Sequence, residues 1–303
     1  MKERPLSETQ YYLRSAVAGG FAGGLAKTAV APLERVKILL QTHDKDFRRF
    51  SGTWRGPVYA LQHIATSQGV RGLFQGHTLT LARAVPHAAI GYTVYDRVKL
   101  WLMPTPAQNT SLRRVLAGAI TGISAMPFTY PFELVRVRMA VEGHVRPTPW
   151  GAVRGIYAEG RGRLPVLHFY RGFAVSLLGT VPYRGGIFLV WETLHAEAKA
   201  RVDPATLQLH KTGIDLAMGA AAGTLAQVVT YPLEVIRRTQ QASGRGSPDR
   251  MVGFRETVGS VWAVNGWRSF FTGMGIGLFK QVPMTAISLA TWQLAKKTLD
   301  LPN

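Results

Sequence analysis

A proline followed by an acid and a base recurs three times, at intervals of about 100 residues, in a chain of 303 residues. The copies are Pro32-Leu33-Glu34-Arg35-Val36-Lys37, Pro131-Phe132-Glu133-Leu134-Val135-Arg136 and Pro232-Leu233-Glu234-Val235-Ile236-Arg237. In each copy the acid and the base are three residues apart and share one face of a helix. One copy alone would suggest a solvated pair worth about 0.2–0.5 kcal/mol. Three copies in register predict a tandem triplication.

Each proline lies inside a long helical stretch, where it removes a backbone hydrogen bond and kinks the helix. If three such helices converge, each acid can pair with the base of a neighbouring helix. We expect Glu34 to pair with Arg136, Glu133 with Arg237, and Glu234 with Lys37. These pairs would form a ring that closes one end of a central cavity.

A second and weaker ring is expected in the later helix of each repeat, after Pro86, Pro182 and Pro283. Its polar positions are Asp96, Glu192 and Gln293, and the bases three residues further on are Lys99, His195 and Lys296. Gln293 carries no charge, and a histidine is only partly charged near neutral pH. The expected ionic contacts are Asp96 with a neighbouring base and Glu192 with Lys296, at the opposite end of the cavity.

The elements that position these residues repeat with the motif. Before each motif proline two glycines lie four residues apart, which lets helix backbones approach closely: they are Gly19 and Gly23, Gly118 and Gly122, and Gly219 and Gly223. The first long span is expected from Leu13 to about Gln41. Short helices are expected at 56–67, 151–159 and 254–265, each followed by an aromatic-x-Gly, with a five-residue insertion within 161–168. We therefore predict one domain, 1–303, with repeats at 11–104, 110–202 and 210–301.

Composition favours an amphipathic membrane bundle. The chain has 36 Lys+Arg against 17 Asp+Glu and a net charge of +19, which indicates an anionic partner: nucleic acid, an acidic membrane or a phosphorylated small molecule. Apolar residues make up 47%, yet the mean hydropathy is only +0.04. Helices with one face in lipid and the other on a polar cavity reconcile these values. A soluble nucleic-acid-binding protein would instead place its bases along exposed faces rather than beside three phased prolines.

Other classes find less support. With no cysteine, disulfides and thiolate metal sites are impossible. We find no metal-ligand spacing, no nucleophile with its histidine and acid, and no phosphate-binding glycine loop, so we expect neither an enzyme nor a bound cofactor or metal. Met1 to Gln10 contain neither a signal peptide nor an Arg-rich presequence, so targeting information should be internal. A pore would differ from a carrier in lacking saturable counter-exchange.

The triplicated motif, each copy followed by a short helix and an aromatic-x-Gly, resembles the mitochondrial carrier family from Leu13 to Leu299. The resemblance implies an all-α, six-helix transmembrane bundle with pseudo-three-fold symmetry and three short matrix-side helices, acting as a monomer by alternating access. It makes the first ring the matrix gate, with Gln41 as its bracing glutamine, and the second ring the gate on the cytoplasmic side. It implies an inner mitochondrial membrane, although a peroxisomal membrane stays open, with both termini facing the intermembrane space.

The same resemblance implies lipid and substrate sites. Cardiolipin would bind backbone amides near Gly52, Gly76, Gly151, Gly172, Gly253 and Gly273, since helix N-termini bind phosphate. Gln68 and Asn265 stand where the family usually has an acid, which puts its supporting salt bridges in repeats one and three in doubt. Substrate contacts fall on Arg83, Gly179, Thr180 and Lys280, with Lys27 and Arg184 as further cations in the cavity. Two cations suit an anion, and a glycine leaves room for a flat ring.

Among family members, Gly24 to Pro32, Gly69 to His77, Leu134 to Ala140 and Gly179 to Tyr183 most resemble the coenzyme A carriers, including fungal ones. The ADP/ATP exchangers share Lys27 to Pro32, but here Arg237-Arg238 is followed by Thr239 rather than by a third arginine. Arg184 and His87 depart from the coenzyme A carriers, which usually have Ala and Tyr there. The expected activity is exchange of coenzyme A for an adenine nucleotide. ADP/ATP or thiamine pyrophosphate are the alternatives.

Overall fold

The computed structural model describes residues 8–44, 46–105, 108–142, 148–160, 164–203, 211–243 and 252–299. The long helices are α1 (Glu8–Gln41), α3 (His77–Leu102), α4 (Ser111–Val141), α6 (Phe173–Arg201), α8 (Lys211–Ala242) and the pair α10 (Met274–Phe279) and α11 (Gln281–Thr298). The short helices are α2 (Gly56–Gln68), α5 (Pro149–Glu159) and α9 (Phe254–Asn265). They are followed by the 3₁₀ turns η2 (Val70–Phe74), η4 (Pro165–Tyr170) and η5 (Gly266–Phe271), and η1 (Arg48–Phe50) precedes α2. The predicted all-helical class and the three short helices are confirmed.

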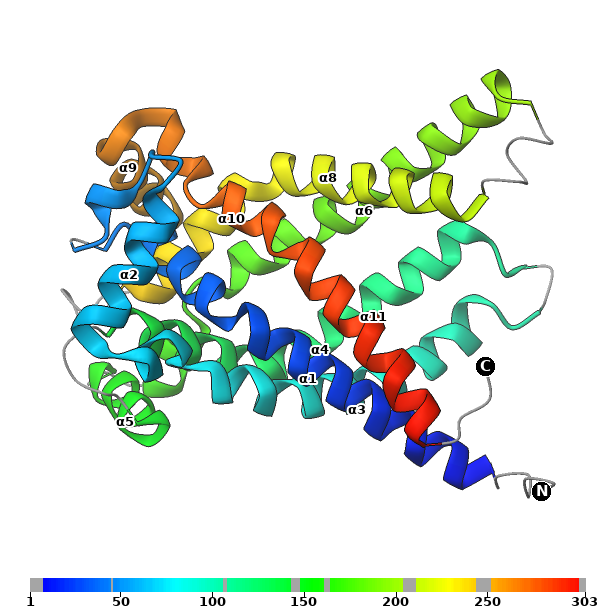
Figure 1. Ribbon diagram of the computed structural model, residues 1–303, viewed down its shortest axis with the longest axis horizontal. Coiled ribbons are helices and arrows are strands. Elements are labelled where there is room, and N and C mark those ends of the chain that lie inside the picture. Colours follow the sequence, from blue (N-terminus) through cyan, green and yellow to red (C-terminus); the bar gives the residue numbers. More distant parts are fainter. Residues whose placement is uncertain are drawn as a thin grey trace.

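The long helices form a closed ring in which neighbouring repeats pack against each other. The extensive contacts join α3 to α4, α6 to α8, and α11 back to α1. Figure 1 shows α2, α5 and α9 gathered at one end of the bundle, while the start of α1 and the end of α11 lie at the other. The short helices therefore mark one end of the bundle, and the start of α1 and the end of α11 mark the other.

Four helical segments are long and apolar enough to cross a membrane: Arg14–Gln41, Leu112–Val141, Pro165–Arg201 and Gly213–Ala242. Neither α3 nor α11 is among these segments: α3 carries four charged residues, and α11 carries two lysines in its last turn and several polar residues before them. Large apolar side chains on the outside of the bundle are exposed, among them Phe21, Val85, Leu189 and Val229. The pattern fits helices with one face toward lipid and the other toward a polar interior.

Prolines lie inside the helices at the predicted places, with one local difference. Pro32, Pro131 and Pro232 lie within α1, α4 and α8. The last long helix is divided at Lys280 into α10 and α11, whereas the sequence suggested a single stretch. Pro283 cannot donate to the carbonyl of Phe279, four residues earlier, so a helical hydrogen bond is missing there, although Pro86 and Pro182 at the equivalent places leave α3 and α6 continuous.

Candidate functional site

The three motif acids form the three predicted interhelical pairs. Arg136 Nη2 lies 2.6 Å from Glu34 Oε2, and Lys37 Nζ lies 2.8 Å from Glu234 Oε1. Arg237 contacts Glu133. These pairs join α1 to α4, α8 to α1, and α4 to α8, so they form a closed ring at the end of the bundle that carries the short helices. The predicted pairing is confirmed as geometry, and the role of the ring as a gate stays a prediction.

The structure adds cations that the motif did not predict. Glu133 is also contacted by Arg83 Nη1 at 2.6 Å and by Arg238 Nη1 at 2.9 Å. Glu34 is also contacted by Lys280. Arg83 and Lys280 were predicted as substrate contacts between the two rings, and Arg238 was not predicted as a member of either ring or of the substrate site. Only the folded helices show that cations from α3, α8 and α10–α11 share the carboxylates of the ring.

Burial makes these pairs sensitive to the loss of a partner. The side chain of Glu133 is 8% exposed and that of Lys37 is 7% exposed. Removing one partner of a buried pair costs about 3–5 kcal/mol, because the other charge stays buried without compensation. The ring therefore stabilises this closed arrangement only while every carboxylate keeps its cations.

Two tyrosine–glutamine pairs reinforce the ring. Gln41 Nε2 donates to the hydroxyl of Tyr231 at 2.9 Å and to Glu234 at 3.3 Å. Gln241 Nε2 donates to the hydroxyl of Tyr130 at 3.0 Å. Gln41 was predicted as a brace, whereas Gln241 and both tyrosines were missed. Their regular placement could have revealed them, since each tyrosine precedes a motif proline and each glutamine follows one at the same interval.

The opposite ring is not paired in this structure. Among the described residues, Asp96, Lys99, Glu192 and Lys296 form no ion pair, and Asp96 and Glu192 are exposed. The expected contact of Glu192 with Lys296 is therefore wrong for this conformation. Instead, His195 Nε2 lies 3.1 Å from Asp215 Oδ1, a contact between neighbouring helices α6 and α8. The motif acids and bases are thus paired at one end of the bundle, whereas the acids and bases of the second ring are not paired with one another at the other end.

Repeat two carries a further salt-bridge cluster beside its short helix. Glu159 Oε2 lies 2.8 Å from Arg138 and 3.3 Å from Arg171. The corresponding positions are neutral in repeat one (Leu39, Gln68 and Gln75) and in repeat three (Thr239, Asn265 and Thr272). Repeats one and three therefore lack the charged side chains that this supporting salt bridge needs, as Gln68 and Asn265 indicated from the sequence.

Replacing Glu159 with glutamine should destabilise the protein. The Glu159→Gln variant leaves two buried guanidinium groups without their carboxylate, and we expect a loss of about 3 kcal/mol. Thermal unfolding of the purified protein in detergent measures it. Arg201→Gln is the control, because Arg201 and its partner Glu197 are 78% and 56% exposed, and exposed pairs contribute little. Equal melting temperatures for the two variants would contradict this assignment.

The remaining predicted substrate residues differ in their surroundings. Lys27 of α1 and Arg184 of α6 have no carboxylate partner among the described residues, and both lie near His87 and Arg83 of α3. Thr180 donates to the carbonyl of Ser176 within its own helix, at 2.7 Å. A side chain at Gly179 would meet Leu233 of α8 at 3.6 Å, so this glycine lies at the contact between α6 and α8. Lys27 and Arg184 therefore add two cations without a carboxylate partner to the paired Arg83 and Lys280.

The glycines assigned to lipid lie at element starts and turns. Gly76, Gly172 and Gly273 immediately precede α3, α6 and α10 with φ of 81°, 78° and 81°. Gly52 has φ of 85°, and Gly253 precedes α9. The amide of Gly151 already donates to Thr148 Oγ1 at 3.0 Å. The structure therefore leaves lipid binding at these positions a prediction.

A closed ring of long helices, with ion pairs joining all three repeats at one end and the acids and bases of the second ring not paired with one another at the other, is the architecture of a membrane transporter for small molecules. The chain belongs to the mitochondrial carrier family: the family model described as "Mitochondrial carrier protein" matches residues 8–105, 107–199 and 209–302. Members of this family are multi-pass transporters of the mitochondrial inner membrane and not enzymes.

Several curated relatives match nearly the whole of this chain. "Mitochondrial carrier protein CoAc2" of Zea mays is 34% identical over 312 residues, covering 96% of this chain and 88% of the relative. "Mitochondrial carrier protein CoAc1" of Zea mays is 32% identical over 315 residues, covering 96% and 88%. "Solute carrier family 25 member 16" of Mus musculus is 33% identical over 306 residues, covering 96% and 90%.

Proposed function

We propose that this carrier exchanges coenzyme A for an adenine nucleotide across the inner mitochondrial membrane, by alternating access between two ion-pair gates. The observation that carries the proposal is the set of cations on the long helices next to the ring. Arg83 and Lys280 lie beside the carboxylates of the ring, and Lys27 and Arg184 have no carboxylate partner among the described residues. Such a surplus of positive charge inside a membrane bundle fits a substrate that carries several phosphate groups.

The contacts of Arg83 and Lys280 suggest how binding acts on the gate. A phosphate that binds Arg83 competes with Glu133 for the same guanidinium, and a phosphate that binds Lys280 competes with Glu34. The bound anion thereby weakens two of the three carboxylate sites of the matrix gate. A ligand shifts a conformational equilibrium only through such differences in affinity between states.

The other gate completes the proposed cycle. When the matrix gate opens, the second ring would come together at the opposite end of the bundle. Its members are Asp96, Lys99, Glu192, His195, Gln293 and Lys296. Gln293 is neutral, so this gate should be the weaker of the two. We further propose that the short helices face the matrix, both termini face the intermembrane space, cardiolipin binds near the six glycines, and the carrier acts as a monomer.

The choice of coenzyme A rests on sequence resemblance within the family, through the stretches around Lys27, Gly72, Val137 and Gly179. ADP or ATP is the second candidate, because Lys27 to Pro32 are shared with the ADP/ATP exchangers. Thiamine pyrophosphate would use the same cations with a smaller substrate. All three candidates are phosphorylated and carry a flat heterocycle, so the cavity cations alone do not separate them.

Thermal shift measurements on the purified carrier separate the candidates. A ligand present at 100 times its dissociation constant stabilises the folded state by about 2.7 kcal/mol. We expect coenzyme A to raise the apparent melting temperature more than ADP, ATP or thiamine pyrophosphate at equal concentration. In proteoliposomes, uptake of labelled coenzyme A should saturate and should require internal coenzyme A or adenine nucleotide. A larger shift with another ligand, or uptake into empty vesicles, would argue against this assignment.

A further inference from the structure

The three contacts between the motif helices are not equivalent. Between α4 and α8, Tyr130 pairs with Gln241, and between α8 and α1, Tyr231 pairs with Gln41. Each tyrosine hydroxyl also donates to a carbonyl beside the aromatic-x-Gly turn, at Arg171 (2.7 Å) or Thr272 (3.1 Å). Each of these pairs thus links two repeats and a 3₁₀ turn.

Between α1 and α4 both members of the pair are missing. Ala31 precedes Pro32 where the other repeats have a tyrosine, and Ala140 stands at the register of the two glutamines. A pocket lies at this place, and both alanines line it, together with Arg35, Ile38 and residues of η2 and α3. The small side chains leave a space where the other two contacts are filled by an aromatic ring and an amide.

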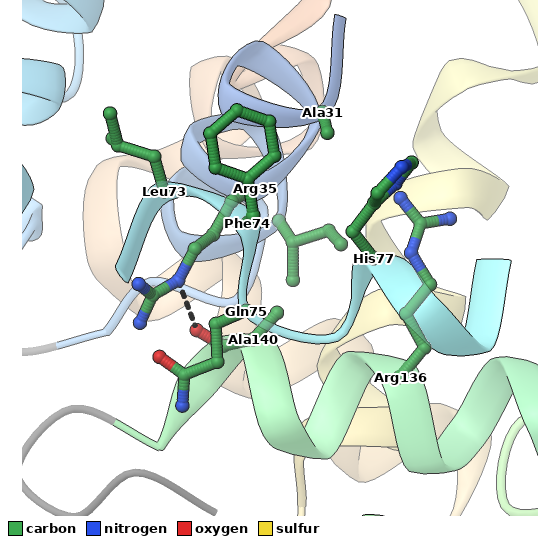
Figure 2. A pocket seen from close by; sticks show the side chains of 9 residues that line it. Ala31, Arg35, Leu73, Phe74, Gln75, His77, Arg136 and Ala140 are labelled. Atoms are coloured by element: carbon green, nitrogen blue, oxygen red, sulfur yellow. Dashed lines mark hydrogen bonds between the residues drawn. The ribbon is translucent and has the colours of Figure 1, made fainter. Parts of the chain in front are cut away.

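Arg35 of α1 lines this pocket. Its side chain is buried, with 2% of the residue exposed. Its Nε donates to the carbonyl of Ala140 on α4 at 3.1 Å, and its Nη1 donates to the carbonyl of Gly72 in η2. Figure 2 shows the guanidinium reaching Ala140 from the α1 side of the pocket. Arg35 therefore also links two repeats and a 3₁₀ turn.

The other repeats have apolar residues at the position of Arg35. Leu134 and Val235 are both fully buried, and each packs in an apolar cluster with its own tyrosine, Tyr130 or Tyr231. At this position, three residues after the motif proline, an arginine thus occurs only in the repeat whose tyrosine is replaced by alanine. We propose that Arg35 is a positioning residue that holds the α1–α4 contact closed, in place of the tyrosine–glutamine pair.

The two bonds of Arg35 have different roles during opening. Gly72 belongs to the same repeat as Arg35, so that bond fixes the guanidinium within repeat one. Ala140 belongs to repeat two, so that bond breaks when α1 and α4 separate. Its carbonyl lies at the C-terminal end of α4, where the helix dipole favours a cation. No carboxylate pairs with Arg35 among the described residues, which leaves a hydrogen-bonded contact that can be released.

Thiol labelling tests this proposal without a substrate. It rests on the alternating access proposed above, but not on coenzyme A as cargo. The chain contains no cysteine, so one introduced thiol is a unique reporter. The reporter is Val137→Cys, because Val137 is fully buried in a cluster that joins Ile38 of α1 to α4. The control is Ala60→Cys, which is equally buried but packs in a cluster of repeat-one residues and Ile276 of α10, with no residue of α4.

In proteoliposomes, Arg35→Leu should increase the maleimide labelling rate at position 137 about tenfold or more, the effect of losing one charged hydrogen bond. The rate at position 60 should not change. Arg35→Lys, which cannot make both bonds, should show a smaller increase at 137 and also serves if Arg35→Leu does not fold. Adding Ala31→Tyr and Ala140→Gln to Arg35→Leu reproduces the α4–α8 contact and should return the rate at 137 to near that of the parent.

Three outcomes would overturn the proposal. Unchanged labelling at position 137 in both Arg35 variants would show that Arg35 does not hold this contact. Equal acceleration at positions 137 and 60 would show a general loss of stability. Labelling that stays fast in the triple variant would show that Arg35 does not replace a tyrosine–glutamine pair. Failure of coenzyme A to bind would leave all of these rates unaffected, so the two proposals fail separately.

Discussion

Replacing Glu133 with glutamine is expected to abolish substrate exchange and to lower the stability of the ion-paired state by about 3–5 kcal/mol. Glu133 is the most heavily shared carboxylate of the ring, because Arg83, Arg237 and Arg238 all contact it and its side chain is 8% exposed. Glutamine keeps the size of the side chain but removes the negative charge. Three guanidinium groups would then face one another without a counter-charge.

The measurements are thermal unfolding in detergent and counter-exchange of labelled coenzyme A in proteoliposomes. Glu197→Gln is the matched control, because Glu197 pairs only with Arg201 in an exposed contact on α6. Such exposed pairs contribute about 0.3–0.5 kcal/mol, so the control should behave as the parent protein. Parent-like melting of Glu133→Gln would refute the view that this carboxylate holds α4 to α8.

Arg83→Ala and Lys280→Ala are expected each to lower the exchange efficiency by about tenfold to a hundredfold, and the double variant by more. A hydrogen bond to a charged group contributes about 1.5–3 kcal/mol, and each 1.4 kcal/mol is a factor of ten. Because Arg83 contacts Glu133 and Lys280 contacts Glu34, each substitution removes a substrate cation and a gate partner together. Both KM and the maximal rate should therefore change.

Matched controls lie on the same helices. Arg97 on α3 and Lys297 on α11 are exposed, so Arg97→Ala and Lys297→Ala change the net charge equally without touching the ring. They separate a local effect from a general loss of positive charge. If Arg83→Ala and Lys280→Ala take up labelled coenzyme A at parental rates, the substrate site assignment is wrong.

The sequence predicted most of the framework because the chain repeats itself. A proline, an acid and a base at fixed spacing define a kinked helix with a paired face, whatever the surrounding sequence. The three pairs around Glu34, Glu133 and Glu234 followed from this periodicity. The three short helices followed from amphipathic patterns bounded by glycine. Such features depend on local geometry, which repeats whenever the residues repeat.

Features that break the repeat could not be predicted in the same way. The sequence placed Arg83 and Lys280 in mid-cavity, but their long side chains reach the ring carboxylates. Glu192 was expected to pair with Lys296, but in this conformation the motif ring is paired and the second ring is not. Which cations share a carboxylate depends on the distances between converging helices, and no spacing along one chain contains those distances.

The sequence by itself determined a triplicated carrier with a basic cavity and an ion-paired ring, since residue type and interval fix which helix faces carry charge. Only the tertiary structure decided which end of the bundle carries the paired ring, which cations surround Glu133, and that Arg35 links α1 to α4 beside the pocket that Ala31 and Ala140 line. The physical reason is that a void and a shared partner are properties of several helices at once. Sequence periodicity predicts which residues share a face of each helix, whereas the packing of the helices decides which side chains contact one another.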